Sequence, residues 1–372
     1  MSSEKLESLP FDDGFYMPSE NHPHEAIWMA WPERCDNWRL GAKPAQAVFV
    51  ELAKAIAATT PVYMICSASQ YQNAKAQLGD AATVIEMSTN DAWLRDTGPS
   101  CLLNKDASER RHLDWIFNAW GGLECGLYFP WDKDDQVAAK IAEIYGEERY
   151  RVPMILEGGA IHVDGDGTLY TTEECVFNLG RNSTMSKSEA EAIFRQYLGI
   201  EKVIWLPRGL YNDETNGHID ELMHVVSPGK VLLTWCDDPE DPQHETSREA
   251  LSVLEKTTDA KGRTIEVIKM PMPGPLYITK EEASGIDLAA DSSTSHMDRE
   301  ENTRLAASYT NFLITNGQLI YPKFNVPTDD EAQHILAQCF PEHRLTGVAT
   351  REVLLGGGNI HCITQQIPKR AR

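Results

Sequence analysis

Segments that read as strand, tight turn and strand recur along this chain, and this recurrence constrains its fold more than any other feature. The three clearest segments span residues 160–171, 219–235 and 309–321, and a weaker one spans residues 99–120. The third turns at Asn316-Gly317, and Asn-Gly between two apolar runs is a strong hairpin signal. We therefore expect β-hairpins in these four segments.

Helices and single buried strands are predicted between the hairpins. Val48, Leu52 and Ile56 lie on one stripe at helical spacing, and Ser186 with Glu189 forms a capping box at the start of a helix. The expected elements are a helix over residues 45–59, a strand over 61–66, a helix over 190–198, a strand over 202–206 and a helix over 328–339. The mixture predicts an α/β protein.

These elements form units with a period of roughly 65–80 residues, which is longer than the period of the usual solenoid repeats. Repetition at this scale is better explained by units arranged radially about an axis than by one open sheet. The alternative is an ordinary α/β sheet whose hairpins recur by chance. No low-complexity linker divides the sequence, so we expect one domain over residues 1–372.

The charge balance argues for small cations as ligands rather than nucleic acids. The chain has 56 acidic and 34 basic residues and a formal net charge of −22. Nucleic-acid binding draws its affinity from clustered Lys and Arg, which this composition does not favour. A field of this sign attracts cations, although an acidic surface can also serve solubility alone.

Nothing in the sequence indicates secretion or a membrane. The first residues lack the apolar core of a signal peptide, and no stretch is long and apolar enough to span a bilayer. The eight cysteines are scattered singly, without zinc-like spacing or a disulfide framework. We expect a cytoplasmic protein of a reducing compartment.

Residues that could take part in catalysis occupy corresponding places in the units. Glu157 immediately precedes its hairpin, His218 and Asp220 open theirs, and Asp96 leads into the weaker one. Cys362 has a similar place in the last, shorter unit. Residues at equivalent positions of units arranged about an axis would meet at that axis, so the pattern predicts one shared site.

Two carboxylates at such a site suit a planar cation. Asp96 and Asp220 can each accept paired N–H donors from a guanidinium group. Trp93, three residues before Asp96, can stack on that plane or add a cation–π attraction of about 0.5–2 kcal/mol. Taken singly, Trp93 could equally pack in the core and each Asp could cap a turn.

Cys362 is the candidate nucleophile for the carbon of a guanidinium. Thiolate attack would give a tetrahedral adduct, and loss of ammonia would leave a thiouronium that water hydrolyses. His218 can carry the protons and Glu157 can hold its imidazole. His361 is a rival base, but on a strand it would point to the opposite face from its neighbour Cys362. A lone cysteine or histidine is more often a core residue.

The sequence gives weaker support to two other kinds of site, a divalent metal site and a phosphate-binding loop. On a strand, His218, Asp220 and His224 would share one face and could bind a divalent metal, but this leaves Cys362 without a role. The glycines at 356–358 lack the spacing of a phosphate-binding loop. Both are therefore less favoured than a cysteine nucleophile with a guanidinium substrate, and the resemblance described next implies neither a metal nor an organic cofactor.

The motifs that hold these residues resemble those of a known family along nearly the whole chain. They are residues 14–20 (GFYMPSE), 28–32 (WMAWP), 93–99 (WLRDTGP), 118–122 (NAWGG), 157–159 (EGG), 216–220 (NGHID) and 356–362 (GGGNIHC). Together they are similar to the agmatine deiminases of the porphyromonas-type peptidyl-arginine deiminase family, within the guanidino-modifying pentein superfamily.

The resemblance implies a five-bladed α/β propeller of pseudo-fivefold symmetry. It also implies a hydrolase of linear amidines that converts agmatine to N-carbamoylputrescine and ammonia, towards polyamines and putrescine, without a cofactor. The roles it carries over are Cys362 as nucleophile, His218 and Glu157 as acid–base pair, Asp96 and Asp220 as guanidinium ligands, and Trp93 and Trp120 as members of the substrate site.

Three alternatives to this function stay open from the sequence. The first is a deiminase for free arginine, whose carboxylate would need a basic partner such as Arg95, Arg181 or Arg208, all near the motifs. The second is an amidinotransferase, and the third is a non-catalytic cation-binding module. We expect a small-molecule guanidino substrate, no nucleic acid, no membrane, and a homo-oligomer (dimer or higher).

Overall fold

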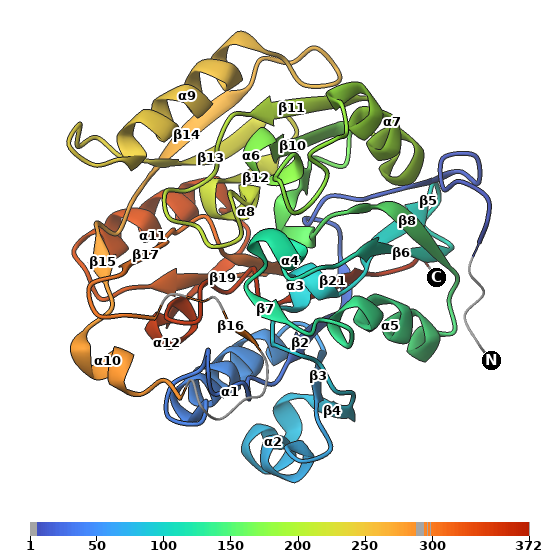
Figure 1. Ribbon diagram of the computed structural model, residues 1–372. Coiled ribbons are helices and arrows are strands. Elements are labelled where there is room, and N and C mark those ends of the chain that lie inside the picture. Colours follow the sequence, from blue (N-terminus) through green and yellow to red (C-terminus); the bar gives the residue numbers. More distant parts are fainter. Residues whose placement is uncertain (1–5, 288–293, 296, 298, 372) are drawn as a thin grey trace.

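Five sheets with the same strand pairing make up most of the fold. The computed structural model describes residues 6–287, 294–295, 297 and 299–371. Within these residues, each of the five sheets has three or four strands and contains an antiparallel pair followed by a parallel pair. Figure 1 shows the sheets around the centre of the molecule, with the longer helices at its outer edge. The fold is mixed α/β, as the sequence predicted.

The strands can be followed sheet by sheet in Figure 1. In pairing order they are β1 (Phe15–Tyr16), β5 (Ser100–Asn104), β6 (Arg110–Ile116) and β8 (Arg149–Ile155); β9 (His162–Val163), β10 (Thr168–Thr172) and β11 (Lys202–Leu206); β12 (Met223–Ser227), β13 (Lys230–Trp235) and β14 (Glu266–Pro271); β18 (Leu313–Thr315), β19 (Gln318–Lys323) and β20 (Arg344–Ala349); and β21 (Gln365–Pro368), β2 (His24–Ala30), β3 (Val62–Cys66) and β4 (Thr83–Glu86). Two smaller pairs join β15 (Leu276–Tyr277) to β17 (Arg304–Leu305) and β7 (Tyr128–Phe129) to β16 (Thr294–Ser295).

The last of these sheets joins the two ends of the described chain. β21 lies antiparallel to β2, with Gln365 opposite Trp28, and β2 continues into the parallel strands β3 and β4. This pairing brings the C-terminal segment, which contains Cys362 just before β21, next to β2 near the start of the chain.

Helices of two kinds connect the strands. The longer ones are α1 (Lys43–Ala57), α2 (Tyr71–Leu78), α5 (Val137–Tyr145), α7 (Lys187–Leu198), α9 (Gln243–Lys256) and α11 (Thr328–Cys339). The short ones are α3 (Leu94–Thr97), α4 (Gly122–Cys125), α6 (Glu173–Val176), α8 (Ile219–Leu222), α10 (Lys280–Ser284) and α12 (Arg351–Leu354). The predicted capping box of Ser186 and Glu189 is present at the start of α7. No helix in the described part of the chain is long and apolar enough to cross a membrane.

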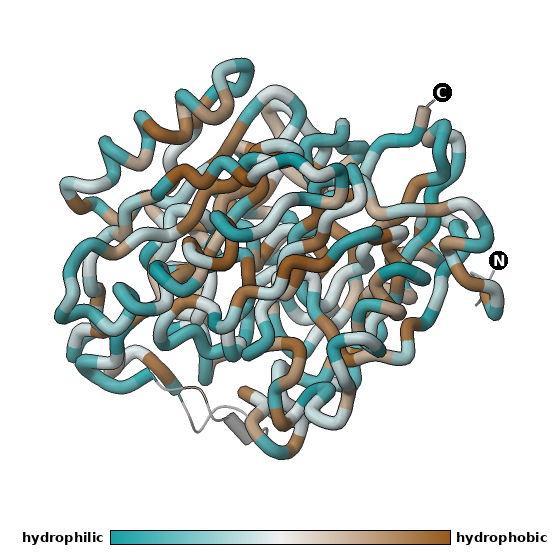
Figure 2. Tube along the Cα trace, turned by 90° about the horizontal axis from the view of Figure 1, so that it is seen from above, coloured by the Kyte–Doolittle hydropathy of each residue, from teal (hydrophilic) through white to brown (hydrophobic). Residues whose placement is uncertain are grey.

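The apolar side chains lie between the sheets and the outer helices. In Figure 2 the brown hydrophobic segments gather in the interior and the teal ones lie around them. Helix α1 buries Phe49, Leu52 and Ile56, whereas Val48 is only half-buried. The apolar stripe of this helix is therefore one residue away from the predicted one at its N-terminal end.

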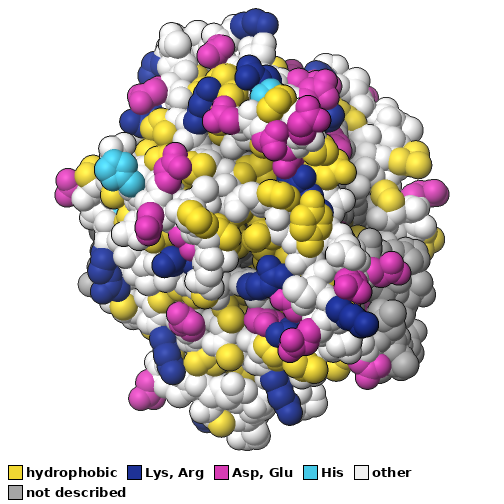
Figure 3. All heavy atoms as spheres, turned by 90° about the vertical axis from the view of Figure 1, so that its left-hand side faces the viewer, with side chains coloured by type: hydrophobic (Ala, Val, Ile, Leu, Met, Phe, Trp, Pro, Cys, Tyr) yellow, Lys and Arg dark blue, Asp and Glu magenta, His cyan; other side chains and the backbone are white. Residues whose placement is uncertain are grey.

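On the face drawn in Figure 3, Lys and Arg side chains lie singly among Asp and Glu. A face of this kind offers no continuous row of cations to a phosphate backbone.

The four predicted hairpins are confirmed as β5–β6, β9–β10, β12–β13 and β18–β19. Two local predictions are wrong. Residues 219–222 form the short helix α8 rather than a strand, so His218, Asp220 and His224 do not share the face of one strand. Cys362 lies in a turn ahead of β21 rather than on a strand. In both places the backbone turns sharply to point polar side chains inward, which a pattern of alternating residues cannot reveal.

Candidate active site

Three ionisable side chains converge at Gly159, which marks the centre of the candidate active site. A methyl group at this position would lie 2.6 Å from His218 Nδ1 and 3.0 Å from both Asp96 Oδ1 and Asp220 Oδ2. Gly159 lies in a single turn of 3₁₀ helix that directly follows Glu157. The close approach of the backbone is possible because glycine has no Cβ.

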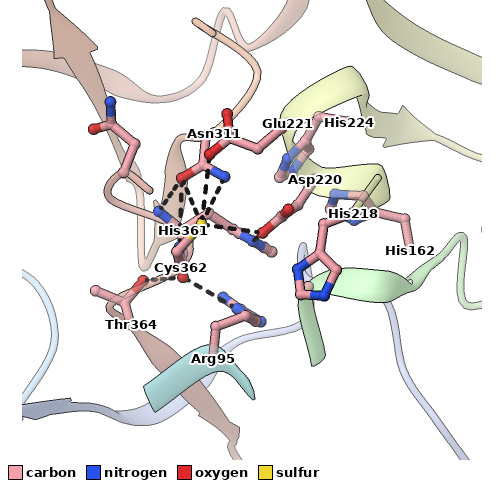
Figure 4. A network of polar contacts seen from close by, with 12 residues as sticks. Arg95, His162, His218, Asp220, Glu221, His224, Asn311, His361, Cys362 and Thr364 are labelled. Carbon is pink, nitrogen blue, oxygen red and sulfur yellow. Dashed lines mark hydrogen bonds and ion pairs between the residues drawn. The ribbon is translucent and has the colours of Figure 1, made fainter. Parts of the chain in front are cut away.

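Cys362 is held beside this group by hydrogen bonds from other segments. Its carbonyl oxygen accepts a hydrogen bond from Arg95 N at 3.1 Å, and its Sγ accepts one from Asn311 Nδ2 at 3.1 Å. Asn311 Oδ1 also accepts a hydrogen bond from the backbone N–H of His361 at 2.9 Å. A methyl group on Gly358 would lie 3.1 Å from the sulfur. Figure 4 shows the thiol and Asn311 meeting in this network.

Carboxyl groups surround the thiol of Cys362. The sulfur lies 3.6 Å from Asp220 Oδ2 and 3.6 Å from Glu221 Oε1. Burial raises the pKa of the thiol well above its usual range, and the charges of Asp220, Glu221 and Asp96 raise it further. The thiol is therefore protonated at neutral pH.

His218 and Glu157 form a buried pair. Glu157 Oε2 is 3.2 Å from His218 Nε2, and Glu157 Oε1 accepts a hydrogen bond from Arg181 Nε at 3.0 Å. Burial by itself would raise the pKa of Glu157, but Arg181 and His218 lower it to about 2. Glu157 is thus a permanent anion that fixes one nitrogen of the imidazole.

The other nitrogen of His218 faces the centre of the site. Nδ1 has no hydrogen-bond partner among the described residues, and it is the atom nearest to Gly159. Burial would lower the pKa of His218, but Asp96, Cys175 and Glu157 together raise it well above its usual value. His218 is therefore an imidazolium whose Nδ1 proton faces the centre of the site.

Asp96 is oriented by two donors. Its Oδ1 accepts a hydrogen bond from Gly159 N and its Oδ2 one from Trp120 Nε1, each at 2.9 Å. Burial raises the pKa of Asp96 to about 6, and the neighbouring charges of Asp220 and Glu157 act in the same direction. Asp96 changes its charge near neutral pH, where a cationic ligand would favour the anion.

Asp220 is held by His361. The His361 Nδ1 lies 2.7 Å from Asp220 Oδ2, and its Nε2 lies 2.8 Å from Glu20 Oε1. Asp220 Oδ1 has no hydrogen-bond partner among the described residues. His361 thus stands behind Asp220, and its nitrogens bind carboxylates rather than the thiol.

An aromatic wall adjoins the thiol. A methyl group on Gly358 would lie 2.7 Å from the Trp93 ring, and the Trp93 ring is stacked on Trp38 with a centroid distance of 5.2 Å. Trp93 and Trp120 meet edge to face at 6.5 Å. All seven residues predicted for the site thus lie together, three of them as the group at Gly159.

The structure also brings in residues that the sequence reasoning missed as part of the site. Arg181 holds Glu157, Asn311 holds Cys362, and Glu20 holds His361. Asn311 could have been predicted as a site residue, since it stands near the start of the hairpin over residues 309–321, as Asp220 does in its own hairpin. The sequence gives Gly159 no role beyond its place in the motif of residues 157–159.

The three arginines near the motifs have separate places. Arg95 donates from Nε to the carbonyl of His361 and pairs with Glu20 at 3.4 Å, and Arg181 pairs with Glu157. Arg208 is exposed and pairs with Glu249 on the surface.

Two groups of side chains have donor atoms within 4.8 Å of one another and could in principle hold a metal ion. One consists of Glu157, Cys175 and His218, which includes the buried pair described above. The other consists of Glu20, His162, His224 and His361 and lies behind Asp220. Neither is the group of His218, Asp220 and His224 considered from the sequence.

A mixed α/β fold that gathers a thiol, an imidazolium and several carboxylates around one buried point is typical of an enzyme that acts on a small cation. Residues 16–368 match the family model for Porphyromonas-type peptidyl-arginine deiminase. The chain belongs to this family.

Relatives and solved structures agree with that membership. The chain is 56% identical to the agmatine deiminase of Pseudomonas aeruginosa over 363 residues, which cover 97% of both chains. It is similar to the solved structure titled agmatine deiminase of Enterococcus faecalis catalyzing its reaction, with a TM-score of 0.95, 46% identity and coverage of 99% and 100%. The solved structure of a C. Jejuni agmatine deiminase with substrate bound matches with a TM-score of 0.82, 26% identity and coverage of 96% and 97%.

Proposed function

We propose that this protein hydrolyses agmatine to N-carbamoylputrescine and ammonia, a step towards putrescine and other polyamines. The observation that carries the proposal is the convergence of His218, Asp96 and Asp220 on Gly159, with the thiol of Cys362 3.6 Å from Asp220. The relatives of the same family that bear the name agmatine deiminase cover nearly the whole chain.

The guanidinium group of the substrate is proposed to bind between Asp96 and Asp220. Each carboxylate can accept two parallel N–H bonds from a guanidinium edge. Asp220 Oδ2 faces the site at Gly159, and Asp220 Oδ1 has no hydrogen-bond partner among the described residues. Trp93 offers an aromatic face beside Cys362, where the planar cation can stack. Entry of the cation also offsets the repulsion among the buried carboxylates.

The first half-reaction forms a thiouronium. The bound cation lowers the pKa of the Cys362 thiol, which loses its proton to solvent water because His218 is already protonated. The thiolate attacks the guanidinium carbon to give a tetrahedral adduct. His218 donates its proton to one nitrogen, the C–N bond breaks, and ammonia leaves. The carbon then remains joined to sulfur.

In the second half-reaction water replaces the sulfur. The imidazole of His218, now neutral and held by Glu157, removes a proton from water as the oxygen attacks the thiouronium carbon. The C–S bond breaks as the C=O bond forms, and the proton of the hydroxyl group passes to the sulfur and restores the thiol, while His218 is left as the imidazolium. The sum is agmatine plus water giving N-carbamoylputrescine plus ammonia, so no electron or other reactant is required.

Agmatine rather than arginine is the proposed substrate because the site is acidic. Arginine carries a carboxylate that would need a basic partner, and both Arg95 and Arg181 are already paired with buried carboxylates. Agmatine ends in a second cation, which suits a chain with a net charge of −22.

The five sheets are proposed to form a closed five-bladed α/β propeller of pseudo-fivefold symmetry in a single domain over residues 1–372. The shared strand pattern of the sheets and the pairing of β21 with β2 support this arrangement. The site would then lie on the axis of the propeller.

The protein is further proposed to act in the cytoplasm as a homo-oligomer. All eight cysteines are free thiols, which suits a reducing compartment. Leu123 and Leu179 expose 82% and 71% of their surface, and large exposed apolar side chains are common at contacts between copies. Light scattering with size exclusion would give the mass of the assembly.

Ammonia release tests the function directly. Purified protein is given agmatine and arginine in parallel at equal concentration. Release from agmatine alone supports the proposal, and release from arginine overturns the proposed substrate. If neither substrate released ammonia, the protein would be a cation-binding protein or an amidinotransferase. Product analysis with added amines would identify an amidinotransferase.

The thiol of Cys362 is expected to react slowly with neutral reagents. Because its pKa is raised, at pH 8 it should be alkylated by iodoacetamide at least about tenfold more slowly than a free thiol of pKa about 8.5. Chloroacetamidine, whose amidinium resembles the substrate, should alkylate Cys362 faster than iodoacetamide does. Bound agmatine should slow the alkylation of Cys362 by either reagent. Mass spectrometry of the Cys362 peptide gives each rate, with half-buried Cys339 as internal control. Rapid labelling of Cys362 by iodoacetamide at pH 7 would contradict the protonated resting thiol.

Replacing Gly159 by alanine is expected to lower turnover by about 100-fold or more, because a misplacement of reacting groups by an ångström has effects of this size. The new methyl group would press on His218 Nδ1 at 2.6 Å and on both Asp carboxylates. Gly285→Ala is a matched control, since its Cβ would lie 3.1 Å from Arg39 Cβ, outside the site. Equal activity in both variants would contradict the placement of the site at Gly159.

A further inference from the structure

A chain of three buried ionisable groups runs away from the proposed substrate position. It begins at Asp220, passes through His361 at 2.7 Å and ends at Glu20 at 2.8 Å. Asp220 and His361 are fully buried, and Glu20 is buried as well. The mechanism proposed above uses only Asp220, so His361 and Glu20 are ionisable groups without a stated role.

Both nitrogens of His361 donate when Asp220 and Glu20 are ionised, as their lowered pKa values indicate. Its Nδ1 faces a carboxylate oxygen of Asp220 and its Nε2 faces one of Glu20, and an ionised carboxylate only accepts. A neutral imidazole could satisfy one of these contacts but not both. Burial and Arg95 would lower the pKa of His361, but Glu20 and Asp220 outweigh them and raise it. His361 is therefore an imidazolium between two anions.

Further charged or titratable groups face this chain. Glu20 faces Arg95, His162 and His24. His361 faces Arg95 and His162. Asp220 faces His218, Asp96, Glu221 and the Cys362 thiol. His224 lies 3.8 Å from Glu20 and stands edge to face with His361.

The surroundings of Asp220 on the substrate side make its charge costly. Burial favours a protonated carboxyl at Asp220, and so does the charge of Asp96 when Asp96 is ionised. Asp96 lies 3.9 Å from His218 Nδ1, beyond hydrogen-bond distance, and burial raises its pKa to about 6 although the charge of His218 acts in the opposite direction. In contrast, His361 and its neighbours His218 and His162 hold the pKa of Asp220 below its usual range, against the effect of burial.

The contact also fixes the carboxylate oxygen that faces the site. His361 binds Asp220 Oδ2, and this oxygen lies 3.6 Å from the thiol and 3.0 Å from a methyl group placed at Gly159. Figure 4 shows Asp220 between His361 and the region where His218 lies. An acceptor that is already fixed in position costs less entropy when a donor binds.

We propose that His361 and Glu20 are positioning residues that keep Asp220 ionised and hold its carboxylate beside Cys362 and Gly159, where the substrate guanidinium would bind. This assignment rests on the proposed function, because it gives Asp220 the task of binding that cation. Glu20 stabilises the imidazolium from behind, and the imidazolium stabilises Asp220.

Two substitutions at His361 separate charge from orientation. His361→Ala removes both, and kcat/KM for agmatine should fall by about 10- to 100-fold, mainly through a higher KM, as expected for loss of a charged hydrogen bond. His361→Asn keeps a donor near the position of Nδ1 and should recover part of the loss in KM. Both variants should lose kcat/KM at a higher pH than the wild type on the acid side, because Asp220 then titrates as well.

The matched control is His112→Asn. His112 is also fully buried and its Nε2 lies 2.7 Å from Glu147 Oε2, but it has no contact with the site residues named above. Its substitution should lower the melting temperature without moving KM or the pH profile. The proposal is overturned if both His361 variants keep the wild-type KM and pH profile, or if their losses only follow their melting temperatures, as in the control.

The charge of His361 can be measured without any turnover. In protein labelled with [15N]histidine, the signal missing from His361→Asn identifies this ring, and its nitrogen shifts should be those of an imidazolium at pH 7.5. A neutral ring at that pH would overturn the assignment even in an active enzyme. Failure of the wild type to release ammonia from agmatine would instead refute the proposed function, and an imidazolium signal would still support the His361–Asp220 pairing.

Discussion

Replacing Cys362 by serine should lower kcat for ammonia release from agmatine by about 10⁴-fold or more, because loss of a covalent nucleophile has effects of this size. A serine hydroxyl is far less acidic than a thiol, and the surrounding carboxyl groups make an anion at this position costly. The substrate cation lowers that cost enough for a thiol but not for an alcohol.

The fold and the binding of agmatine should survive this change. Asp96 and Asp220 remain in place, so calorimetry should still detect agmatine binding to Cys362→Ser. Cys66→Ser is a matched control, since Cys66 is a buried thiol on β3 without a role in the mechanism, and it should keep its turnover. More than about a tenth of the wild-type activity in Cys362→Ser would rule out covalent catalysis by this residue.

The hairpins could be predicted from the sequence because their signals are local. Asn316-Gly317 forces a tight turn whatever surrounds it, and β18 and β19 pair across it with Thr315 opposite Gln318. The capping box of Ser186 is local in the same way. The convergence of the site was predictable for a second reason, namely that chemical residues stood at equivalent places in successive units.

The partners of the catalytic groups could not be predicted, because they come from distant parts of the chain. Arg181 binds Glu157 from 24 residues away, Asn311 binds Cys362 from 51 residues away, and Glu20 binds His361 from 341 residues away. No local pattern links such pairs.

The backbone at the catalytic residues also departs from regular structure. Residues 219–222 turn as helix α8 directly after His218, and Cys362 lies in a turn. These turns allow His361 and Cys362, which are adjacent, to contact the same carboxylate oxygen: His361 Nδ1 lies 2.7 Å and the thiol 3.6 Å from Asp220 Oδ2. The sequence argument against His361 as the base at the thiol assumed that Cys362 lies on a strand, and that assumption is wrong. The observed contacts of the His361 nitrogens with two carboxylates lead to the same conclusion.

Asp96→Asn and Asp220→Asn should each lower kcat/KM for agmatine by about 100- to several thousand-fold, the range that corresponds to removing one partner of a buried charge pair. The amide keeps the shape of the carboxylate but loses its charge, and its NH₂ group faces the N–H donors of the guanidinium. Because these carboxylates contact the cation before and during the attack, most of the loss should appear in KM and the rest in kcat. Wild-type kinetics in both variants would refute the assigned roles.

The pH dependence distinguishes the two carboxylates. The pKa of Asp96 is raised to about 6, so below that pH Asp96 is neutral in the free enzyme, and kcat/KM of the wild type should fall as the pH drops through about 6. In Asp96→Asn this acid limb should disappear. In Asp220→Asn it should remain but move to lower pH, because the charge of Asp220 contributes to the raised pKa of Asp96. Asp220 itself has a lowered pKa and stays ionised through this range, which is why only one carboxylate of the pair controls the limb.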